Sequence, residues 1–159
     1  MIVTRNPLEI VAECISEFGG AKESIMQILT KINEELSYIP AEAVDAVAEA
    51  TGVSPGQVYS VVSFYSFFST SPRGKNIVRV CSTISCAMAG QGDVLSALVE
   101  EFGIAPFETT EDSFLTIETT SCIGLCDQAP AMLVNGTPYG NLTPEKACEI
   151  VRGLKRTEV

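Results

Sequence analysis

The sequence predicts an α+β protein in which a helical first part is followed by a small α/β domain. Apolar residues recur at helical spacing over residues 7–70, whereas β-rich runs follow after residue 75. The segment Ser71-Pro72-Arg73-Gly74 between them has the composition of a turn or linker. We therefore expect a helical N-terminal domain at residues 1–74 and a second domain at residues 75–159.

Four helices are expected in the first part, each with an apolar face repeating every three to four residues. They cover residues 7–18, 22–38 and 41–51, and a fourth helix begins at residue 55. The fourth has the clearest start, because Ser54 is suited to cap it, Pro55 to begin it and Gln57 to complete a capping box.

The second part reads in the order β-α-β-β-β-α. Asn135-Gly136 favours a type I′ turn between two short strands, and Thr143 followed by Pro144 favours the start of the last helix. The expected strands lie at 77–80, 114–117 and 132–134 with a return through 139, and the expected helices at 93–102 and 144–154. This pattern is typical of a small α/β or α+β unit.

Charge and composition exclude several classes of function. The chain has 159 residues, 20 acidic and 10 basic, and no histidine. The net charge of −10 disfavours binding to nucleic acids and to anionic membranes. The missing histidine excludes Ser-His-Asp catalysis and every His-ligated metal site. No apolar run approaches the roughly 18 residues of a membrane span and no secretory signal is visible, so we expect a cytoplasmic protein without direct membrane insertion.

Four of the six cysteines form two pairs, and each pair follows an expected strand. Cys81 and Cys86 form C-x4-C, and Cys122 and Cys126 form C-x3-C after 35 intervening residues. Structural zinc usually uses C-x2-C, and dithiol redox centres use C-x-x-C, so neither spacing fits well. Four thiolates on two wider loops suit a [2Fe–2S] cluster. Structural zinc and two disulfides remain as alternatives, although disulfides are disfavoured in a reducing compartment.

The neighbours of these cysteines suit a buried anionic group. Ser82, Thr83, Ser85 and Ser121 offer hydroxyl donors, and Gly124 allows close approach of the backbone. Few of the donors are cationic, so we expect a reduction potential of order −400 mV, as in other all-Cys [2Fe–2S] centres.

The two remaining cysteines are expected to be core residues. Cys14 and Cys148 each lie on the apolar face of an expected helix.

These motifs resemble those of the thioredoxin-like [2Fe–2S] ferredoxins. Beside the cysteine spacing, the resemblance rests on Ala129-Pro130-Ala131-Met132 and on residues 139–144. The first part is similar to the helical half of the small NADH dehydrogenase subunit of complex I, which has relatives in electron-bifurcating [FeFe]-hydrogenases and NAD-dependent formate dehydrogenases. That similarity rests on residues 36–40, Val58-Tyr59, Phe64-Tyr65 and Pro72-Arg73-Gly74-Lys75.

The resemblance implies an N-terminal helical bundle joined to a thioredoxin-like domain. It implies that Cys81, Cys86, Cys122 and Cys126 ligate one [2Fe–2S] cluster. It also implies a larger partner subunit that carries FMN and the NAD(P) site, and a further iron–sulfur or catalytic subunit. The chain itself would then exchange single electrons and hold no catalytic residue. Two alternative functions remain for the chain: a freestanding soluble [2Fe–2S] ferredoxin and, from another class, a structural zinc module.

Two local features depart from many relatives. Asp127 stands where a Gly often follows the fourth cysteine, and its charge should lower the reduction potential further. Residues 87–89 are Ala-Met-Ala where a basic or bulky residue is common. The segment Gly90-Gln91-Gly92 begins like a dinucleotide-binding loop but lacks its third glycine. Hydride chemistry is therefore not assigned to this chain.

The aromatic segment at residues 61–68 allows two interpretations. It is either a buried part of the helical core or, in part, a surface that meets the flavin subunit.

Overall fold

The computed structural model describes residues 5–154. The chain divides into two compact units, with the boundary between Pro72 and Arg73. Over the part that is described, no helix is both long and apolar enough to cross a membrane.

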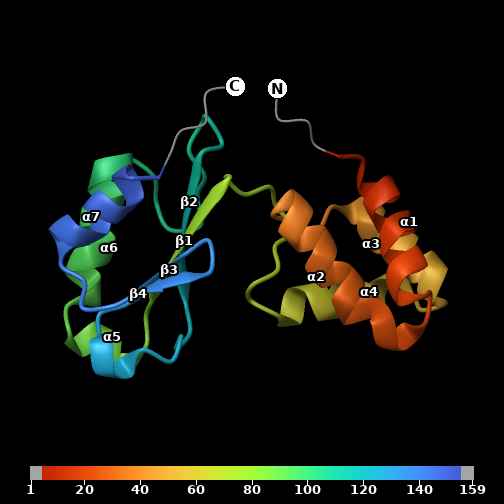
Figure 1. Ribbon diagram of the computed structural model, residues 1–159, viewed down its shortest axis with the longest axis horizontal. Helices are drawn as coiled ribbons and strands as arrows, with labels where there is room; N and C mark the ends of the chain where they lie inside the picture. Colours follow the sequence, from red (N-terminus) through yellow and green to blue (C-terminus); the bar gives the residue numbers. More distant parts are fainter. Residues whose placement is uncertain (1–4, 155–159) are drawn as a thin grey trace. The chain divides into compact units, whose positions relative to one another are not determined.

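The first unit is a bundle of four α-helices (Figure 1). They are α1 (Pro7–Phe18), α2 (Ile25–Leu36), α3 (Ala41–Thr51) and α4 (Pro55–Phe64). One core joins them, and its most enclosed side chains include Ile28 and Ile32 of α2, Val47 of α3 and Val58 of α4. The helical first part is thus confirmed.

The local start and stop signals explain where these helices end. Ser54 and Gln57 form the expected reciprocal capping box at the start of α4. The second helix begins later than predicted, at Ile25, because residues Lys22–Ser24 form a 3₁₀ turn, η1. The Ser24 hydroxyl donates to the carbonyl of Phe18 (2.8 Å), which ties this turn to the end of α1.

The second unit contains a four-stranded mixed sheet in the order β2-β1-β3-β4. Its strands are β1 (Asn76–Cys81), β2 (Leu115–Thr120), β3 (Met132–Val134) and β4 (Thr137–Tyr139). β1 and β2 are parallel, and β3 is antiparallel to both β1 and β4. Asn135 and Gly136 both have positive φ (50° and 84°), as the predicted type I′ hairpin requires.

Three helices accompany this sheet. α6 (Gln91–Phe102) and α7 (Pro144–Arg152) lie side by side against one face (Figure 1). They enclose a second core that includes Val80, Ile117, Leu98 and Val151. The sequence pattern did not predict α5 (Ile84–Met88), because five residues are too few to show a helical period.

The segment that enters β1 is held by a buried ion triad. Glu118 of β2 lies opposite Arg79 of β1, and their Oε2 and Nε atoms are 2.9 Å apart. Arg73 Nη1 lies 3.2 Å from Oε1 of the same carboxylate, and only 4% of the Arg73 side chain is exposed. Burial lowers the pKa of Arg73, although Glu118 opposes this shift.

Gly74 allows the backbone of the same segment to lie close to the backbone of β2. A Cβ at this position would lie 2.7 Å from the backbone nitrogen of Leu115, so no other residue fits without a shift. The Gly74 N–H donates to Thr116 Oγ1 at 2.6 Å.

Candidate metal centre

The four paired cysteines come together at one end of the sheet in the second unit. β1 and β2 are parallel, so their carboxyl ends meet at the same edge. Cys81 is the last residue of β1, and Cys122 follows the end of β2 by two residues. Cys86 lies on α5, and Cys126 begins the 3₁₀ turn η2 (Cys126–Gln128). Both α5 and the turn at η2 lie at this end of the unit (Figure 1).

The sulfurs group as two pairs. The Sγ atoms of Cys122 and Cys126 are 3.3 Å apart, and the thiols of Cys81 and Cys86 are hydrogen-bonded to each other. Within residues 5–154, no three His, Cys, Asp or Glu side chains converge in the manner of ligands to a single ion.

Gly124 shapes the second loop as the sequence suggested. Its φ of +85° is a conformation that glycine adopts without strain. Its backbone N–H donates to Cys122 Sγ at 3.4 Å.

Thr83 links the two pairs. Its hydroxyl lies 3.2 Å from Cys81 Sγ and also forms a hydrogen bond with the thiol of Cys122. Ser85 makes a hydrogen bond with Cys126 in the same region. Two of the four expected hydroxyl donors therefore contact sulfur. Ser82 instead donates to the carbonyl of Thr120, and Ser121 is exposed.

Backbone donors also reach these thiols, and sequence reasoning missed them. The N–H groups of Thr83 and Ile123 act on Cys81, and that of Ala131 acts on Cys86. Every residue except proline carries an N–H group, so only the fold reveals which of them point at a sulfur.

In each pair, one thiol ionises more readily than the other. Burial raises the pKa of Cys81, but hydrogen bonds led by Thr83 outweigh burial, and the net shift is downward. The Gly124 N–H and the neighbouring Cys126 lower the pKa of Cys122. Burial and the Cys81 thiol raise the pKa of Cys86, and the Cys122 thiol raises that of Cys126. The thiolate is the form of cysteine that binds metals.

The site is buried on one side and accessible on the other. Cys81 and Cys86 are each 1% exposed and pack with Ala131. Cys122 and Cys126 are exposed. A group held by all four sulfurs would therefore have one edge in the protein and one edge at the surface.

The remaining cysteines lie where they were expected. Cys14 is enclosed in the core of the helical bundle, and Cys148 in the core of the second unit.

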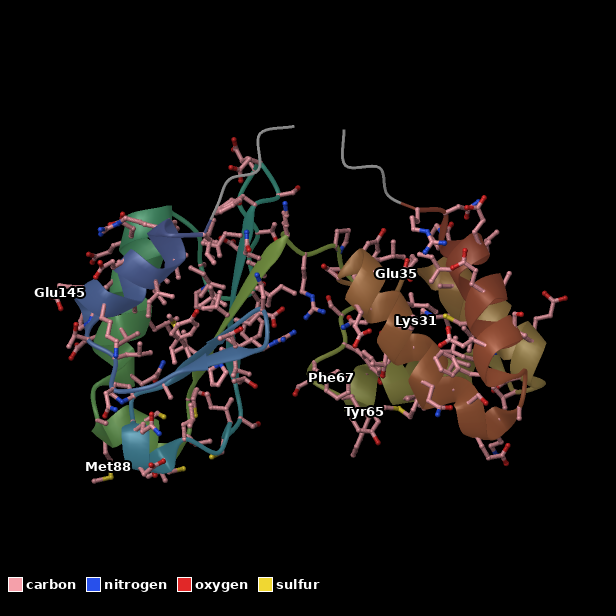
Figure 2. The ribbon with its side chains drawn as sticks, in the orientation of Figure 1. Lys31, Glu35, Tyr65, Phe67, Met88 and Glu145 are labelled. Atoms are coloured by element: carbon pink, nitrogen blue, oxygen red, sulfur yellow. The ribbon has the colours of Figure 1, made fainter. Side chains whose placement is uncertain are left out.

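Some side chains of the aromatic segment at residues 61–68 are buried and others are exposed. Val62 and Phe68 are buried, which confirms the core interpretation for them. Phe64 and Phe67 are 79% and 40% exposed. The Tyr65 ring contacts Phe64, Phe67 and Phe68, so the exposed rings continue directly from the core (Figure 2).

Comparison with known proteins identifies the family. Residues 11–155 match the family model of the thioredoxin-like [2Fe–2S] ferredoxins. The chain belongs to this family. It therefore has a thioredoxin-like α/β domain after its helical part, as predicted, and its cofactor is one [2Fe–2S] cluster.

Similar proteins include subunits of NADH-quinone oxidoreductases. The ferredoxin is 36% identical over 120 residues to NADH-quinone oxidoreductase subunit 2 of Thermus thermophilus, covering 76% of this chain and 66% of that protein. It is 32% identical over 149 residues to an NADH-quinone oxidoreductase subunit of Mycobacterium tuberculosis, covering 93% of this chain and 59% of the relative. The chain thus spans less than two thirds of the length of these two relatives.

A solved structure with a similar fold is that of an NAD⁺-reducing [NiFe]-hydrogenase in its H₂-reduced state. The TM-score is 0.68 at 29% identity, and the match covers 78% of this chain and 21% of the hydrogenase chain.

The residues at the sheet edge fit the family's cluster. The four sulfurs in two pairs would supply two ligands for each of two irons, and the surrounding hydroxyl and N–H donors suit an anionic group. When bound, the cluster supplies one-electron redox chemistry.

Proposed function

We propose that this ferredoxin is the electron-transfer subunit of a multi-subunit NAD(P)-linked oxidoreductase of the NADH dehydrogenase, hydrogenase or formate dehydrogenase type. It exchanges single electrons with a larger partner subunit that carries FMN and the NAD(P) site. A further iron–sulfur or catalytic subunit completes the complex, which acts in the cytoplasm. The chain takes no part in bond making or breaking.

The observation that carries the proposal is that Cys81, Cys86, Cys122 and Cys126, the proposed ligands of the cluster, lie in two pairs at one sheet edge. The sulfurs of each pair contact each other, and Thr83 joins the pairs. The exposure of Cys122 and Cys126 supports an electron-exchange role, because a redox centre must lie close to the surface that its partner covers.

The helical domain at 1–74 supports a subunit rather than an independent carrier. The cluster domain at 75–159 contains all four proposed ligands, so a freestanding ferredoxin does not need the added bundle. The names of the similar proteins, which are subunits of NADH-quinone oxidoreductases and an NAD⁺-reducing hydrogenase, support the same choice.

The first test is the iron and acid-labile sulfide content of the anaerobically purified chain, with EPR after dithionite reduction. We expect about two irons and two sulfides per chain and the rhombic signal of a reduced [2Fe–2S] centre. One zinc without sulfide would refute the electron-transfer function and leave a structural module.

Alanine variants separate the proposed ligands from the other cysteines. Cys122→Ala and Cys126→Ala should lose the cluster signal. The matched controls Cys14→Ala and Cys148→Ala should keep two irons per folded chain, because these thiols lie in the two apolar cores. Full iron content in a Cys122→Ala variant would contradict the ligand assignment.

A further inference from the structure

We propose that the turn formed by residues 140–142, together with Lys146 of α7, holds the Cys126 loop (residues 126–131) in the position that binds the cluster. We call residues 140–142 the supporting turn. Gly140 and Lys146 are then positioning residues, which act on the cluster only through this loop. The inference rests on the proposed assignment of Cys126 as a ligand, and it adds the residues that place that ligand.

The Cys126 side chain is exposed, so its position depends on the backbone that follows it. Cys126 begins the turn η2, which ends at Gln128, and the chain then continues to β3. The far end of the Cys126 loop is anchored in the unit. Ala131 is fully buried, and its carbonyl accepts a hydrogen bond from the Cys81 N–H at 3.0 Å. Between Cys126 and this anchor, the loop is held by the supporting turn.

Two backbone hydrogen bonds join the supporting turn to the Cys126 loop. The Asn141 N–H donates to the carbonyl of Gln128 at 2.6 Å, and the Leu142 N–H donates to the carbonyl of Pro130 at 3.1 Å. The segment that joins β4 to α7 passes this end of the unit, where α5 and η2 also lie (Figure 1). Leu142 is itself enclosed in the core of the second unit, so the supporting turn ties the loop to that core.

Gly140 brings the supporting turn into direct contact with Gln128. A Cβ at Gly140 would lie 2.6 Å from the Gln128 Cβ and 3.0 Å from the Gln128 carbonyl oxygen. Neither of these atoms is the movable end of a side chain, so neither can give way without a shift of the backbone. Any other residue at this position must therefore displace Gln128, and Cys126 lies only two residues before it.

Lys146 holds the supporting turn from the side of α7. Its Nζ donates to the carbonyl of Gly140 at 2.9 Å and to the carbonyl of Asn141 at 3.2 Å. Hydrogen bonds from a charged donor are stronger than those between neutral groups. The next two residues of α7, Ala147 and Cys148, are buried in the core of the second unit. A packed helix thus fixes the two carbonyls of the turn.

Stabilisation of α7 alone does not account for this lysine. The Thr143 hydroxyl already caps the helix, because it accepts a hydrogen bond from the Lys146 backbone N–H at 3.2 Å. Lys146 lies in the first turn of α7, where the helix dipole disfavours a cation. The charge therefore stands at the end of the helix that it stabilises least, whereas its donors reach the supporting turn.

The test measures iron release from the full-length chain, loaded with its cluster and purified anaerobically. Lys146→Met keeps an unbranched side chain and removes the donors, and Lys146→Arg retains a charged donor. The matched control is Arg152→Met at the other end of α7, because this guanidinium donates to Glu101 at 2.6 Å. For Gly140→Ala the control is Gly92→Ala in α6, where a Cβ would have no neighbour within 4 Å.

Three readouts separate positioning from general stability. They are the rate at which excess bathophenanthroline removes iron from the dithionite-reduced chain, the EPR spectrum of the reduced centre, and the midpoint of urea unfolding. We expect Lys146→Met to release iron about fivefold faster than wild type, with an unfolding midpoint close to that of Arg152→Met. Lys146→Arg, Arg152→Met and Gly92→Ala should stay within about twofold of the wild-type rate. Gly140→Ala should release iron at least about tenfold faster and show a changed EPR spectrum, because its new methyl group displaces Gln128.

Equal iron release in Lys146→Met and Arg152→Met would overturn the inference, because the loss of any exposed contact of α7 would then have the same effect. A Gly140→Ala chain with the wild-type rate and spectrum would overturn it as well. Either result leaves the proposed function standing when wild type holds two irons and gives the [2Fe–2S] signal. Full iron content in Cys126→Ala would instead overturn the ligand assignment, and the inference with it.

Discussion

The hydroxyl of Thr83 should raise the reduction potential of the cluster, and Thr83→Val should lower it. The hydroxyl lies 3.2 Å from Cys81 Sγ and also reaches Cys122. A thiolate bound to iron has no proton to give, so in the loaded protein the hydroxyl must be the donor. A donor to sulfur stabilises the reduced cluster more than the oxidised cluster, because the reduced form carries one more negative charge.

The magnitude follows from how much that hydrogen bond strengthens on reduction. A hydrogen bond contributes about 0.5–1.5 kcal/mol net, and one to a charged group contributes more. The hydroxyl has a single hydrogen and so serves one sulfur at a time. If reduction strengthens the bond by about 1 kcal/mol, its removal lowers the midpoint by roughly 40 mV, since 59 mV is a tenfold change in a one-electron couple.

An anaerobic redox titration followed by EPR measures this shift. The matched control is Thr83→Ser, which keeps the hydroxyl and should stay within about 15 mV of wild type, a difference below a twofold change in the equilibrium. Iron content reports whether each variant still holds the cluster. A Thr83→Val protein with full iron content and an unchanged or higher midpoint would refute the reasoning.

Three further predictions concern the two cores and the ion triad. Glu118→Gln leaves the buried guanidinium of Arg73 facing a neutral amide, so the free energy of unfolding in urea should fall by about 3 kcal/mol. A fall below about 1 kcal/mol would contradict the pairing. Phe68→Ala should cost about 3 kcal/mol, whereas Phe64→Ala at a 79% exposed site should leave the unfolding free energy nearly unchanged; equal costs would refute this contrast. Burial raises the pKa of the Cys148 thiol above its ordinary value of 9.0, so the folded state holds that proton more tightly than the unfolded state. Its stabilisation is therefore complete at neutral pH and declines above about pH 9, and the urea midpoint should fall more steeply with pH in wild type than in Cys148→Ala.

Local signals in the sequence predicted most of the secondary structure. The Ser54–Gln57 capping box and the Asn135-Gly136 turn each involve only neighbouring residues, and the structure has both. The pairing of β1 with β2 could not be read in this way, because its partners lie 39 residues apart. The ion triad escaped prediction for the same reason, since Glu118 meets Arg79 only once that pairing exists.

The candidate site was predictable in composition but not in geometry. Cysteine spacing indicated which thiols belong together, and the hydroxyl-rich loop indicated donors. Nothing local showed that Cys81 and Cys86 are buried while Cys122 and Cys126 are exposed. This difference in exposure depends on the direction in which each loop leaves the sheet edge, and the tertiary fold sets that direction.

The parallel pairing of β1 and β2 also dictates when the metal centre can form. A growing chain displays Cys81 and Cys86 long before Cys122 and Cys126, and the two pairs meet only after the strands have paired. Ala131 is synthesised later still, and its carbonyl accepts a hydrogen bond from the Cys81 N–H at 3.0 Å. The four proposed ligands can therefore act together only in a folded second unit, and binding of the cluster would favour the folded form of that unit.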